Sequence, residues 1–241
     1  MLSKSQIKLI TGLGQKKYRD QSQLFIAEGP KVIAELLDSG MQLHTLYTTD
    51  PSLFSVEVQQ LNEAELKKIS FLKTPNTALA VFHIPKPKPI ANSGLTLALD
   101  SVRDPGNLGT IIRLCDWFNI SRVLCSTDTA DCYNPKVIQA TMGSIARVEV
   151  HYTDLSHVLI ESEQPLYGAC MEGENVYATS LHENAILVMG NEAHGISEEI
   201  LRLLNKKITI PQFGPEQKTE SLNVATATAI LLSEFRRSTE R

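Results

Sequence analysis

The sequence predicts an α/β protein with a parallel β-sheet in its C-terminal part and a smaller α/β unit in front of it. From about residue 95 onward, short and nearly continuous apolar runs alternate with helical patterns or turns. Such runs are typical of parallel strands that are covered by helices on both faces. The proline-rich segment PKPKPIANSG at 85–94 separates this region from the residues before it, as an exposed linker does.

Residues 1–84 are predicted to form the small α/β unit. Its main helix is GPKVIAELLDSG at 29–40, which has Pro30 in its first turn and Gly40 at its end. A second helix is expected at NEAELKKI, 62–69. The predicted strands are QLFIAEG (23–29), LHTLYTT (43–49) and TALAVFHI (77–84).

Residues 95–241 are predicted to form the domain that carries the parallel sheet. One helix is expected to begin in DPGNLGTIIR at 104–113, and another begins at Asn134. The last helix is ESLNVATATAILLSEFRR at 220–237, with Ser221 as its expected N-cap. The predicted strands are LTLALD (95–100), RVLCS (122–126), PLYGAC (165–170), AILVMG (185–190) and KKITIP (206–211).

The composition is that of an ordinary globular protein and argues against several other classes. Of the 241 residues, 42% are hydrophobic and 21% are charged. No window approaches 18 consecutive apolar residues, so no membrane span is expected, and the first residues lack the apolar core of a signal peptide. The four cysteines form no C-x-x-C pair and the six histidines show no metal-binding spacing. A cytoplasmic protein with reduced thiols and no metal is therefore predicted.

The net charge of −4 is unevenly distributed along the chain. Residues 1–90 contain 11 Lys and Arg against 8 Asp and Glu, whereas residues 91–241 contain 12 against 19. The first 19 residues hold five basic residues, among them Lys16, Lys17 and Arg19, and no acid. This basic segment predicts contact with a polyanion, and the alternative is an ordinary solvated helical face.

Three loops with unusual chemistry follow predicted strands of the parallel sheet. They are DPGNLGTIIR after the strand at 95–100, MGNEAHGIS after the strand at 185–190, and IPQFGPEQKTESLNVA after the strand at 206–211. Ligands of open parallel sheets bind beyond the carboxyl ends of the strands, and glycines let the backbone approach a ligand closely. The sequence therefore predicts a ligand site at this edge that reads its ligand through backbone groups.

The three loops resemble the motifs of the SpoU (TrmH-like) branch of the SPOUT RNA methyltransferases. Asn107, Gly109 and Arg113 match the first motif, N-x-G-x-x-x-R. LVMGNEAHGI matches the second motif, M-G-x-E-x-x-G after a strand, and Ile210-Pro211 followed by SLNV matches the third. The stretch QSQLFIAEGPKVIAELL also resembles the small substrate-binding domain that many members carry.

The resemblance implies a knotted parallel-sheet domain with a C-terminal trefoil knot, an obligate homodimer and S-adenosylmethionine as cofactor. The implied reaction is methyl transfer to a ribose 2′-hydroxyl of RNA, with ribosomal RNA favoured over transfer RNA because of the N-terminal domain. One alternative is an RNA-binding module of the same fold that has lost catalysis. Another is a Rossmann-type nicotinamide enzyme, against which the absence of G-x-G-x-x-G argues.

The resemblance also implies roles for individual residues. We expect Arg113 to clamp a phosphate beside the target ribose and to orient the hydroxyl, because a guanidinium is too basic to act as the general base. Gly109 would belong to the loop that contacts RNA, together with Lys16, Lys17 and Arg19. The remaining expected catalytic residues are Asn107, Glu192, Ser221 and Asn223. The expected cofactor-binding residues are Met189, Gly190, Asn191, Ile210, Leu222 and Asn223.

Overall fold

The computed structural model describes residues 1–86, 93–214 and 221–239, and the chain divides into two compact units. The N-terminal unit comprises residues 1–86 and 131–147, and the C-terminal unit comprises residues 87–130 and 148–241. The segment 131–147, which follows the predicted linker, is thus grouped with the N-terminal residues. Positions 87–92 of the predicted linker lie outside the described residues, and the predicted domain boundaries stay a prediction.

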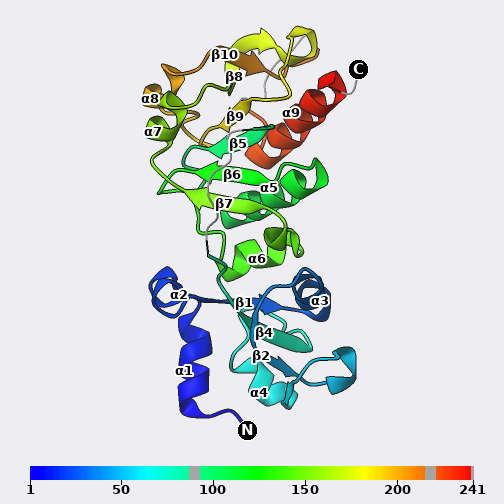
Figure 1. Cartoon of the computed structure of the whole chain (residues 1–241). Coiled ribbons are helices and arrows are strands. Elements are labelled where there is room, and N and C mark those ends of the chain that lie inside the picture. Colours follow the sequence, from blue (N-terminus) through cyan, green and yellow to red (C-terminus); the bar gives the residue numbers. More distant parts are fainter. Residues whose placement is uncertain (87–92, 215–220, 240–241) are drawn as a thin grey trace. The chain divides into compact units, whose positions relative to one another are not determined.

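The N-terminal unit is built on a four-stranded sheet with the order β1-β4-β2-β3 (Figure 1). β4 runs antiparallel to both β1 and β2, and β3 is a short parallel addition to β2. The strands are β1 Leu24–Glu28, β2 Leu43–Thr48, β3 Gln59–Gln60 and β4 Ala78–His83. The helices are α1 Lys4–Gly12, α2 Lys16–Ser22, α3 Pro30–Asp38, η1 Pro51–Leu53, α4 Glu63–Lys67, α6 Pro135–Thr141 and η2 Ser144–Ala146.

Alternating side chains of β1 contribute to two different cores. Ile26 packs with Ile10 of α1, Leu66 of α4 and Leu79 of β4 in one buried cluster. Phe25, one residue earlier, instead stacks on Phe82 at 5.7 Å between ring centroids and lies 5.0 Å from the ring of Tyr133. Because successive strand residues point to opposite faces, β1 is covered on both faces, and the segment that leads into α6 covers one of them.

The C-terminal unit is built on a six-stranded sheet in which every neighbouring pair is parallel. The strand order is β10-β8-β9-β5-β6-β7. The strands are β5 Thr96–Leu99, β6 Arg122–Cys125, β7 Glu149–Tyr152, β8 Leu166–Asn175, β9 Ile186–Met189 and β10 Lys206–Thr209. The helices are α5 Pro105–Trp117, α7 Leu155–Ile160, η3 Val176–Ala178, α8 Glu198–Leu201 and α9 Val224–Thr239.

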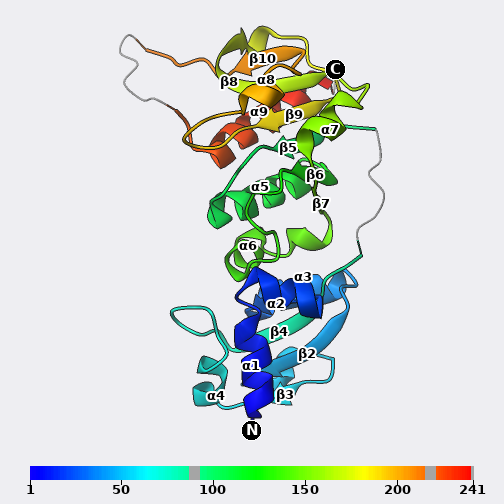
Figure 2. The ribbon, with the colours of Figure 1, turned by 90° about the vertical axis from the view of Figure 1, so that its left-hand side faces the viewer.

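Helices cover both faces of this parallel sheet, as the apolar strands require. α5 and α9 lie side by side over one face, and α7 and α8 lie over the other (Figure 1). Figure 2 shows α7 and α8 from the side on which they cover the strands. Leu159 of α7 and Ile200 of α8 pack with Ala98 and Val188 from the two central strands. The strands that lead into the motif loops are therefore held in place by a buried hydrophobic core.

The structure confirms the fold class and all eight predicted strands; β8 extends five residues beyond the predicted end at residue 170, and the other strand ends differ by at most two residues. β7 was not predicted, because it is an edge strand in which polar Glu149 and His151 alternate with apolar residues. The last helix begins at Val224 and not at Ser221, so the predicted N-cap is wrong. Asn223 caps this helix instead, since its Oδ1 accepts the N–H groups of Ala225 at 3.0 Å and Thr226 at 3.2 Å.

Candidate active site

The first motif loop is a helix start that its own sequence stabilises. Asp104 is the N-cap of α5, and its Oδ1 accepts the N–H of Asn107 at 2.8 Å. Pro105 occupies the first helical position, where a missing N–H costs nothing. The side chain of Asn107 is thereby held at the N-terminal end of α5, just beyond the carboxyl end of β5.

The second motif loop is a tight turn that approaches its own backbone very closely. Asn191 and Gly195 exchange two backbone hydrogen bonds of 2.8 and 2.9 Å. A Cβ atom on Gly190 would lie 2.2 Å from both the carbonyl carbon of Gly195 and the nitrogen of Ile196. Only glycine fits at this position, which explains why the predicted cofactor loop carries it.

A chain of side-chain hydrogen bonds joins all three motif loops. The amide nitrogen of Asn107 donates to Glu192 Oε1 at 2.8 Å, and the amide nitrogen of Asn223 donates to Asn107 Oδ1 at 2.9 Å. The oxygen of Asn223 is already used in capping α9. The structure therefore brings together three of the predicted catalytic residues, and their partners define how each amide is oriented.

A second set of contacts, which the sequence did not predict, braces the first loop against the second. Asp100 is buried at the end of β5, and its Oδ2 accepts the N–H of Ser197 at 2.7 Å. Asn191 Nδ2 donates to the carbonyl oxygen of Ser101 at 2.7 Å. Ser101 holds a left-handed conformation, with φ at 62°, that is rare outside glycine. The acid that ends the strand LTLALD was the available signal for this role.

Behind Ser101, an ion pair and two hydroxyl groups surround Asp128. Arg103 Nη2 lies 2.6 Å from Asp128 Oδ2, and Ser126 and Ser101 donate to Oδ1 at 2.7 and 3.0 Å. The Arg103 guanidinium, followed by the Ser126 hydroxyl, lowers the pKa of the Asp128 carboxyl to about 2. Asp128 therefore stays ionised at neutral pH and keeps its hydrogen bond to Ser101.

A cavity of about 830 Å³ lies beside the second and third loops. Five of the predicted cofactor-binding residues line it, together with the predicted catalytic residues Glu192 and Ser221. The five are Met189, Gly190, Asn191, Ile210 and Leu222. Asn223, the sixth, does not line the cavity and is engaged with Asn107 instead. Sequence reasoning missed the strand residues Cys170 and Met171, which form another part of the wall.

Arg113 lies on the exposed side of α5, six residues beyond Asn107. Its side chain does not line the cavity, and within the described residues no hydrogen bond or ion pair engages it. In the described part of the chain no hydrogen bond joins it to Glu192, which accepts a hydrogen bond from Asn107 instead. The structure thus leaves the Arg113 guanidinium available to a partner from outside the described residues.

Two of the residues predicted to contact RNA are buried, so those predictions are wrong. Arg19 is 2% exposed, because its guanidinium is paired with Asp131 and donates to the carbonyl oxygen of Leu13 at 2.7 Å. Gly109 is buried inside α5, on the side of the helix that faces the core. Lys16 and Lys17 are exposed as predicted, and Lys16 forms an ion pair with Asp20 at 2.9 Å.

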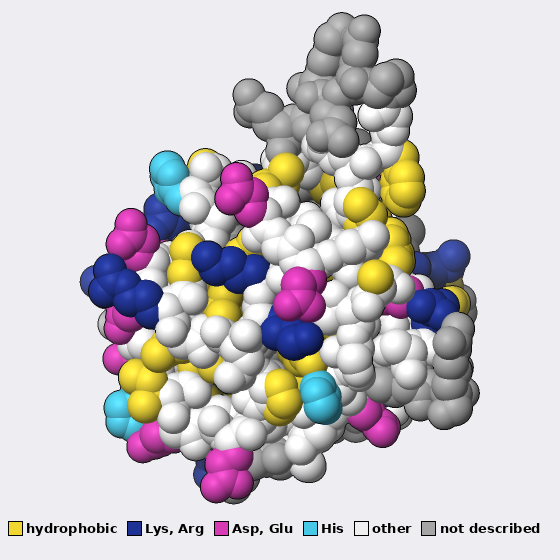
Figure 3. Space-filling view, turned by 90° about the horizontal axis from the view of Figure 1, so that it is seen from above, with side chains coloured by type: hydrophobic (Ala, Val, Ile, Leu, Met, Phe, Trp, Pro, Cys, Tyr) yellow, Lys and Arg dark blue, Asp and Glu magenta, His cyan; other side chains and the backbone are white. Residues whose placement is uncertain are grey.

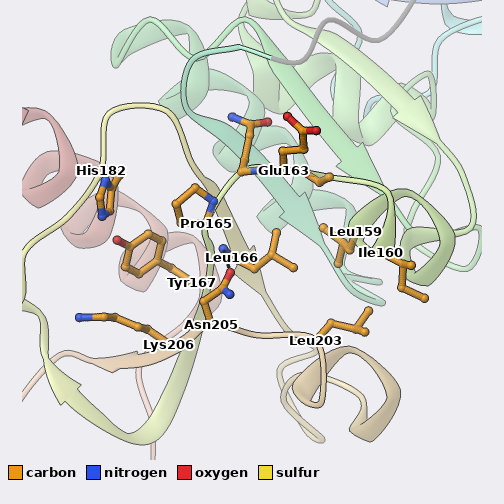
Figure 4. Close-up of a pocket in the computed structure, with 12 residues that line it drawn as sticks. Leu159, Ile160, Glu163, Pro165, Leu166, Tyr167, His182, Leu203, Asn205 and Lys206 are labelled. Carbon is orange, nitrogen blue, oxygen red and sulfur yellow. Dashed lines mark hydrogen bonds between the residues drawn. The ribbon is translucent and has the colours of Figure 1, made fainter.

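A further cavity, of about 590 Å³, lies in the C-terminal unit and contains no predicted site residue. It opens near the amino end of β8, where Tyr167 and His182 face each other across 6.4 Å between ring centroids and Lys206 approaches from β10 (Figure 4). Lys206 is paired with Glu174 at 3.4 Å. This cavity is at the opposite strand ends from the motif loops, and five of the predicted cofactor-binding residues line the cavity of about 830 Å³ instead.

Charges on the C-terminal unit are mixed, and the described residues show no metal centre. In the view of Figure 3, basic and acidic side chains alternate on the visible face and are not gathered into one basic patch. Within the described ranges, no group of three or more His, Cys, Asp or Glu residues is arranged to hold a metal ion. Likewise, none of the described helices is long and apolar enough to cross a membrane.

Comparisons with known proteins define the class to which this fold and site belong. The SpoU rRNA Methylase family matches residues 94–233, and the MRM3-like substrate binding domain matches residues 4–80. The chain therefore belongs to the SpoU rRNA methylase family, as the three motifs predicted.

Individual relatives share nearly the whole chain. The Bacillus subtilis enzyme named 23S rRNA (guanosine(2553)-2′-O)-methyltransferase RlmP is 31% identical, with 93% of each chain covered. A Porphyromonas gingivalis structure described as being of the TrmH family is 40% identical, has a TM-score of 0.90, and covers 99% of this chain and 100% of its own. An AdoMet-bound rRNA methyltransferase structure from Sinorhizobium meliloti is 29% identical, has a TM-score of 0.87, and covers 99% of this chain and 97% of its own.

Proposed function

We propose that this protein transfers the methyl group of S-adenosylmethionine to the 2′-hydroxyl of a ribose in ribosomal RNA. The observation that carries the proposal is the hydrogen-bonded chain Glu192–Asn107–Asn223, which joins the three motif loops beside a cavity lined by Gly190. The names of the relatives support ribosomal RNA as the substrate class and S-adenosylmethionine as the cofactor. Transfer RNA is the alternative substrate.

The cavity fits S-adenosylmethionine in size and in the kind of contact that it offers. Its volume of about 830 Å³ falls within the usual range for small-molecule sites, roughly 300–1,000 Å³. Backbone groups at Met189–Asn191 and at Ile210 would hold the adenosine part, and Gly190 leaves the backbone uncovered. Leu222 would cover the ligand from the third loop. When bound, the cofactor supplies an electrophilic methyl group on a sulfonium sulfur.

The side chains of the first loop would act on the RNA. Arg113 carries a permanent positive charge and would clamp the phosphate next to the target ribose with its planar fork. Asn107 is oriented by Glu192 on one side and by Asn223 on the other, so it would fix the start of α5 while RNA binds. Glu192 would accept a hydrogen bond from the substrate with its second carboxylate oxygen, and Ser221 would bond the substrate from the third loop.

In this proposal the protein is a homodimer whose two copies associate through the C-terminal unit. Arg113 and Trp117 lie four residues apart on the exposed side of α5, and Trp117 is 83% exposed. Aromatic side chains are enriched in association surfaces. A dimer through this face would place Arg113 at the interface. Sedimentation is expected to give twice the mass of 26.7 kDa, and a monomer at micromolar concentration would contradict the proposal.

Two further features belong to this proposal. A C-terminal trefoil knot is supported by the structural similarity to the TrmH family and by the return of α9 to α5 after β10. A cytoplasmic location is supported by the four cysteines, which form no disulfide bond in the described part of the chain, as suits a reducing compartment.

The experiment that tests the function begins with the substrate. Ribose 2′-O-methyl sites would be mapped in RNA from cells with and without the protein. The Arg113→Ala variant is then expected to lose turnover on that RNA by roughly 100-fold, because an interaction with the reacting nucleotide in the transition state is lost. Calorimetry with S-adenosylhomocysteine should give nearly unchanged affinity, since Arg113 does not line the cavity.

Two variants serve as controls. Arg113→Lys should rescue poorly, because an ammonium cannot reproduce the planar fork of a guanidinium. Arg202→Ala removes another exposed arginine of the C-terminal unit, and turnover should stay at the wild-type level. If Arg113→Ala keeps full turnover, the role of the first loop is wrong. If the wild-type protein binds RNA and cofactor but transfers no methyl group, it is instead an RNA-binding module of the same fold that has lost catalysis.

A further inference from the structure

Two exposed aromatic rings in the N-terminal unit lie on either side of one glycine turn. Phe71 is 39% exposed and Tyr18 is 43% exposed. A Cβ atom on Gly14 would lie 2.5 Å from Cε1 of the Phe71 ring, so this ring rests directly on the turn between α1 and α2. A Cβ atom on Gly12 would lie 3.6 Å from the Tyr18 ring. The two rings therefore pack against glycines that are only two residues apart, Gly12 at the end of α1 and Gly14 in the turn that follows it.

A buried carboxylate holds the loop that carries Phe71. Glu28, at the end of β1, is buried, and its Oε1 accepts the N–H of Phe71 at 2.7 Å. Its Oε2 accepts the hydroxyl of Ser70 at 2.6 Å. Burial raises the pKa of Glu28, although both hydrogen bonds oppose that shift. Burying a carboxylate costs free energy, and here the buried carboxylate of Glu28 holds Ser70 and Phe71 at the start of an exposed loop.

The far end of the same loop is anchored beside Gly29. Gly29 has φ at 91°, and a Cβ atom there would lie 2.8 Å from Nδ2 of Asn76. The segment 70–76 therefore lies against the end of β1 at both of its ends, and Phe71 and Lys73 are exposed on it.

Exposed basic residues stand close in sequence to the two rings and to the residues that anchor the Phe71 loop. In the sequence, Lys17 precedes Tyr18, Lys73 lies two residues after Phe71, and Lys31 lies two residues after Gly29, in the first turn of α3. All three are exposed, and the ion pairs found among the described residues include none of them. The arrangement combines flat apolar rings with positive charges, which is the pattern that binds the bases and phosphates of single-stranded nucleic acid.

We propose that this surface, Tyr18, Phe71 and Lys17, Lys31 and Lys73, binds unpaired nucleotides of the substrate RNA. The bases of an RNA duplex are stacked on one another, so a protein ring stacks only on bases in a loop, a bulge or an end. The inference rests on the proposed function, because it takes RNA as the substrate. It adds that the element recognised by the N-terminal unit contains unpaired bases, held by stacking on Phe71 and Tyr18.

The test uses the full-length protein and two RNA probes with equal numbers of phosphates. One is a hairpin with an unpaired loop, and the other is a blunt duplex. Phe71→Leu keeps an apolar side chain but removes the aromatic face. It is expected to weaken hairpin binding roughly tenfold, within the range for stacking of one base, with duplex binding and the salt dependence unchanged. Phe71→Trp should retain hairpin binding.

Two further variants test the contributions of the lysine charges and of an exposed apolar side chain to RNA binding. The double variant Lys17→Gln, Lys73→Gln should weaken binding of both probes and flatten the salt dependence, because fewer counterions are released. Leu53→Ala removes an apolar side chain of similar exposure, 45%, in the same unit, and hairpin binding should not change. Equal melting temperatures would show that each variant is folded.

Three results would overturn the inference. They are hairpin binding by Phe71→Leu that equals the wild type, an equal loss for hairpin and duplex, and an equal loss in Leu53→Ala. In these cases methylation by the wild-type protein still supports the proposed function. If the wild-type protein binds neither probe and methylates no RNA, the proposed function fails together with this inference.

Discussion

The Gly190→Ala substitution is the most direct test of the cofactor loop, because the structure gives the size of the clash. The added Cβ would lie 2.2 Å from the carbonyl carbon of Gly195 and from the nitrogen of Ile196. Non-bonded carbon atoms prefer about 3.5 Å or more, so the backbone must move by about 1.3 Å. Both contacted atoms belong to main chain and cannot rotate out of the way, as the end of a side chain would.

The turn that must move is held by several hydrogen bonds. Asn191 and Gly195 exchange two, Asn191 Nδ2 donates to Ser101, and the N–H of Ser197 donates to Asp100. Loss of two such bonds costs about 2 kcal/mol. Overpacking adds about 1–3 kcal/mol, so the total is about 3–5 kcal/mol. Since about 1.4 kcal/mol corresponds to a tenfold change, the two lost hydrogen bonds, at about 2 kcal/mol, correspond to about a 30-fold loss of affinity for S-adenosylhomocysteine, and the overpacking is expected to lower the melting temperature.

Calorimetry and thermal melting measure the two parts of this cost. Gly12→Ala is the matched control, because its Cβ would meet the Tyr18 ring at an ordinary 3.6 Å, at the last residue of α1. That variant should keep its cofactor affinity and gain up to about 1 kcal/mol of stability, since alanine favours helix. A Gly190→Ala protein with wild-type affinity and melting temperature would refute the reasoning about the turn.

Two other predictions concern titration and thiol chemistry. The folded-state pKa of Asp128 is about 2, below its ordinary 3.8, so its contribution to stability is complete above about pH 4 and is lost as the pH falls towards 2. The difference in urea midpoint between the wild type and Asp128→Asn should therefore shrink from pH 7 to pH 2.5, and a constant difference would contradict this. Cys170 is the one cysteine that is not buried, and it lines the cavity, so iodoacetamide should label it before Cys115. Because burial raises the pKa of the Cys170 thiol, labelling of Cys170 should be slow at pH 7. S-adenosylhomocysteine bound in the cavity should slow it further. Equal labelling with and without S-adenosylhomocysteine would show that this ligand binds elsewhere.

Local patterns in the sequence predicted most of the elements because each pattern has a local physical cause. The strands of the parallel sheet are buried on both faces, so their apolar runs are continuous and easy to recognise. β7 lies at the edge of the sheet and alternates polar and apolar residues, and it was missed for that reason. The predicted cap of α9 is two residues too early, because Ser221 and Asn223 are both suitable cap residues, and only the bonds that Asn223 Oδ1 accepts from Ala225 and Thr226 show which one caps the helix.

Long-range pairing is what the sequence could not supply. Arg19 is one of five basic residues in an acid-free segment, and this favoured an RNA contact. Its partner Asp131 is 112 residues away, and burial of the pair removes Arg19 from the surface. Long-range pairing is also missing from the predicted site: the motifs identified Asn107 and Glu192 separately, but not the hydrogen bond that joins their side chains.

The position of Arg113 follows from the helix that carries it, because its side chain has no partner among the described residues. α5 is fixed at its N-terminus by the Asp104 cap and at its C-terminus by Arg236, which donates to the carbonyl oxygens of Phe118 and Asn119 at 2.7 Å each. A helix of 13 residues held at both ends is a stiff support for a guanidinium that must meet a phosphate. The cofactor loop needs close backbone approach and therefore depends on Gly190, whereas the substrate loop needs a well-placed side chain and therefore depends on the anchoring of α5.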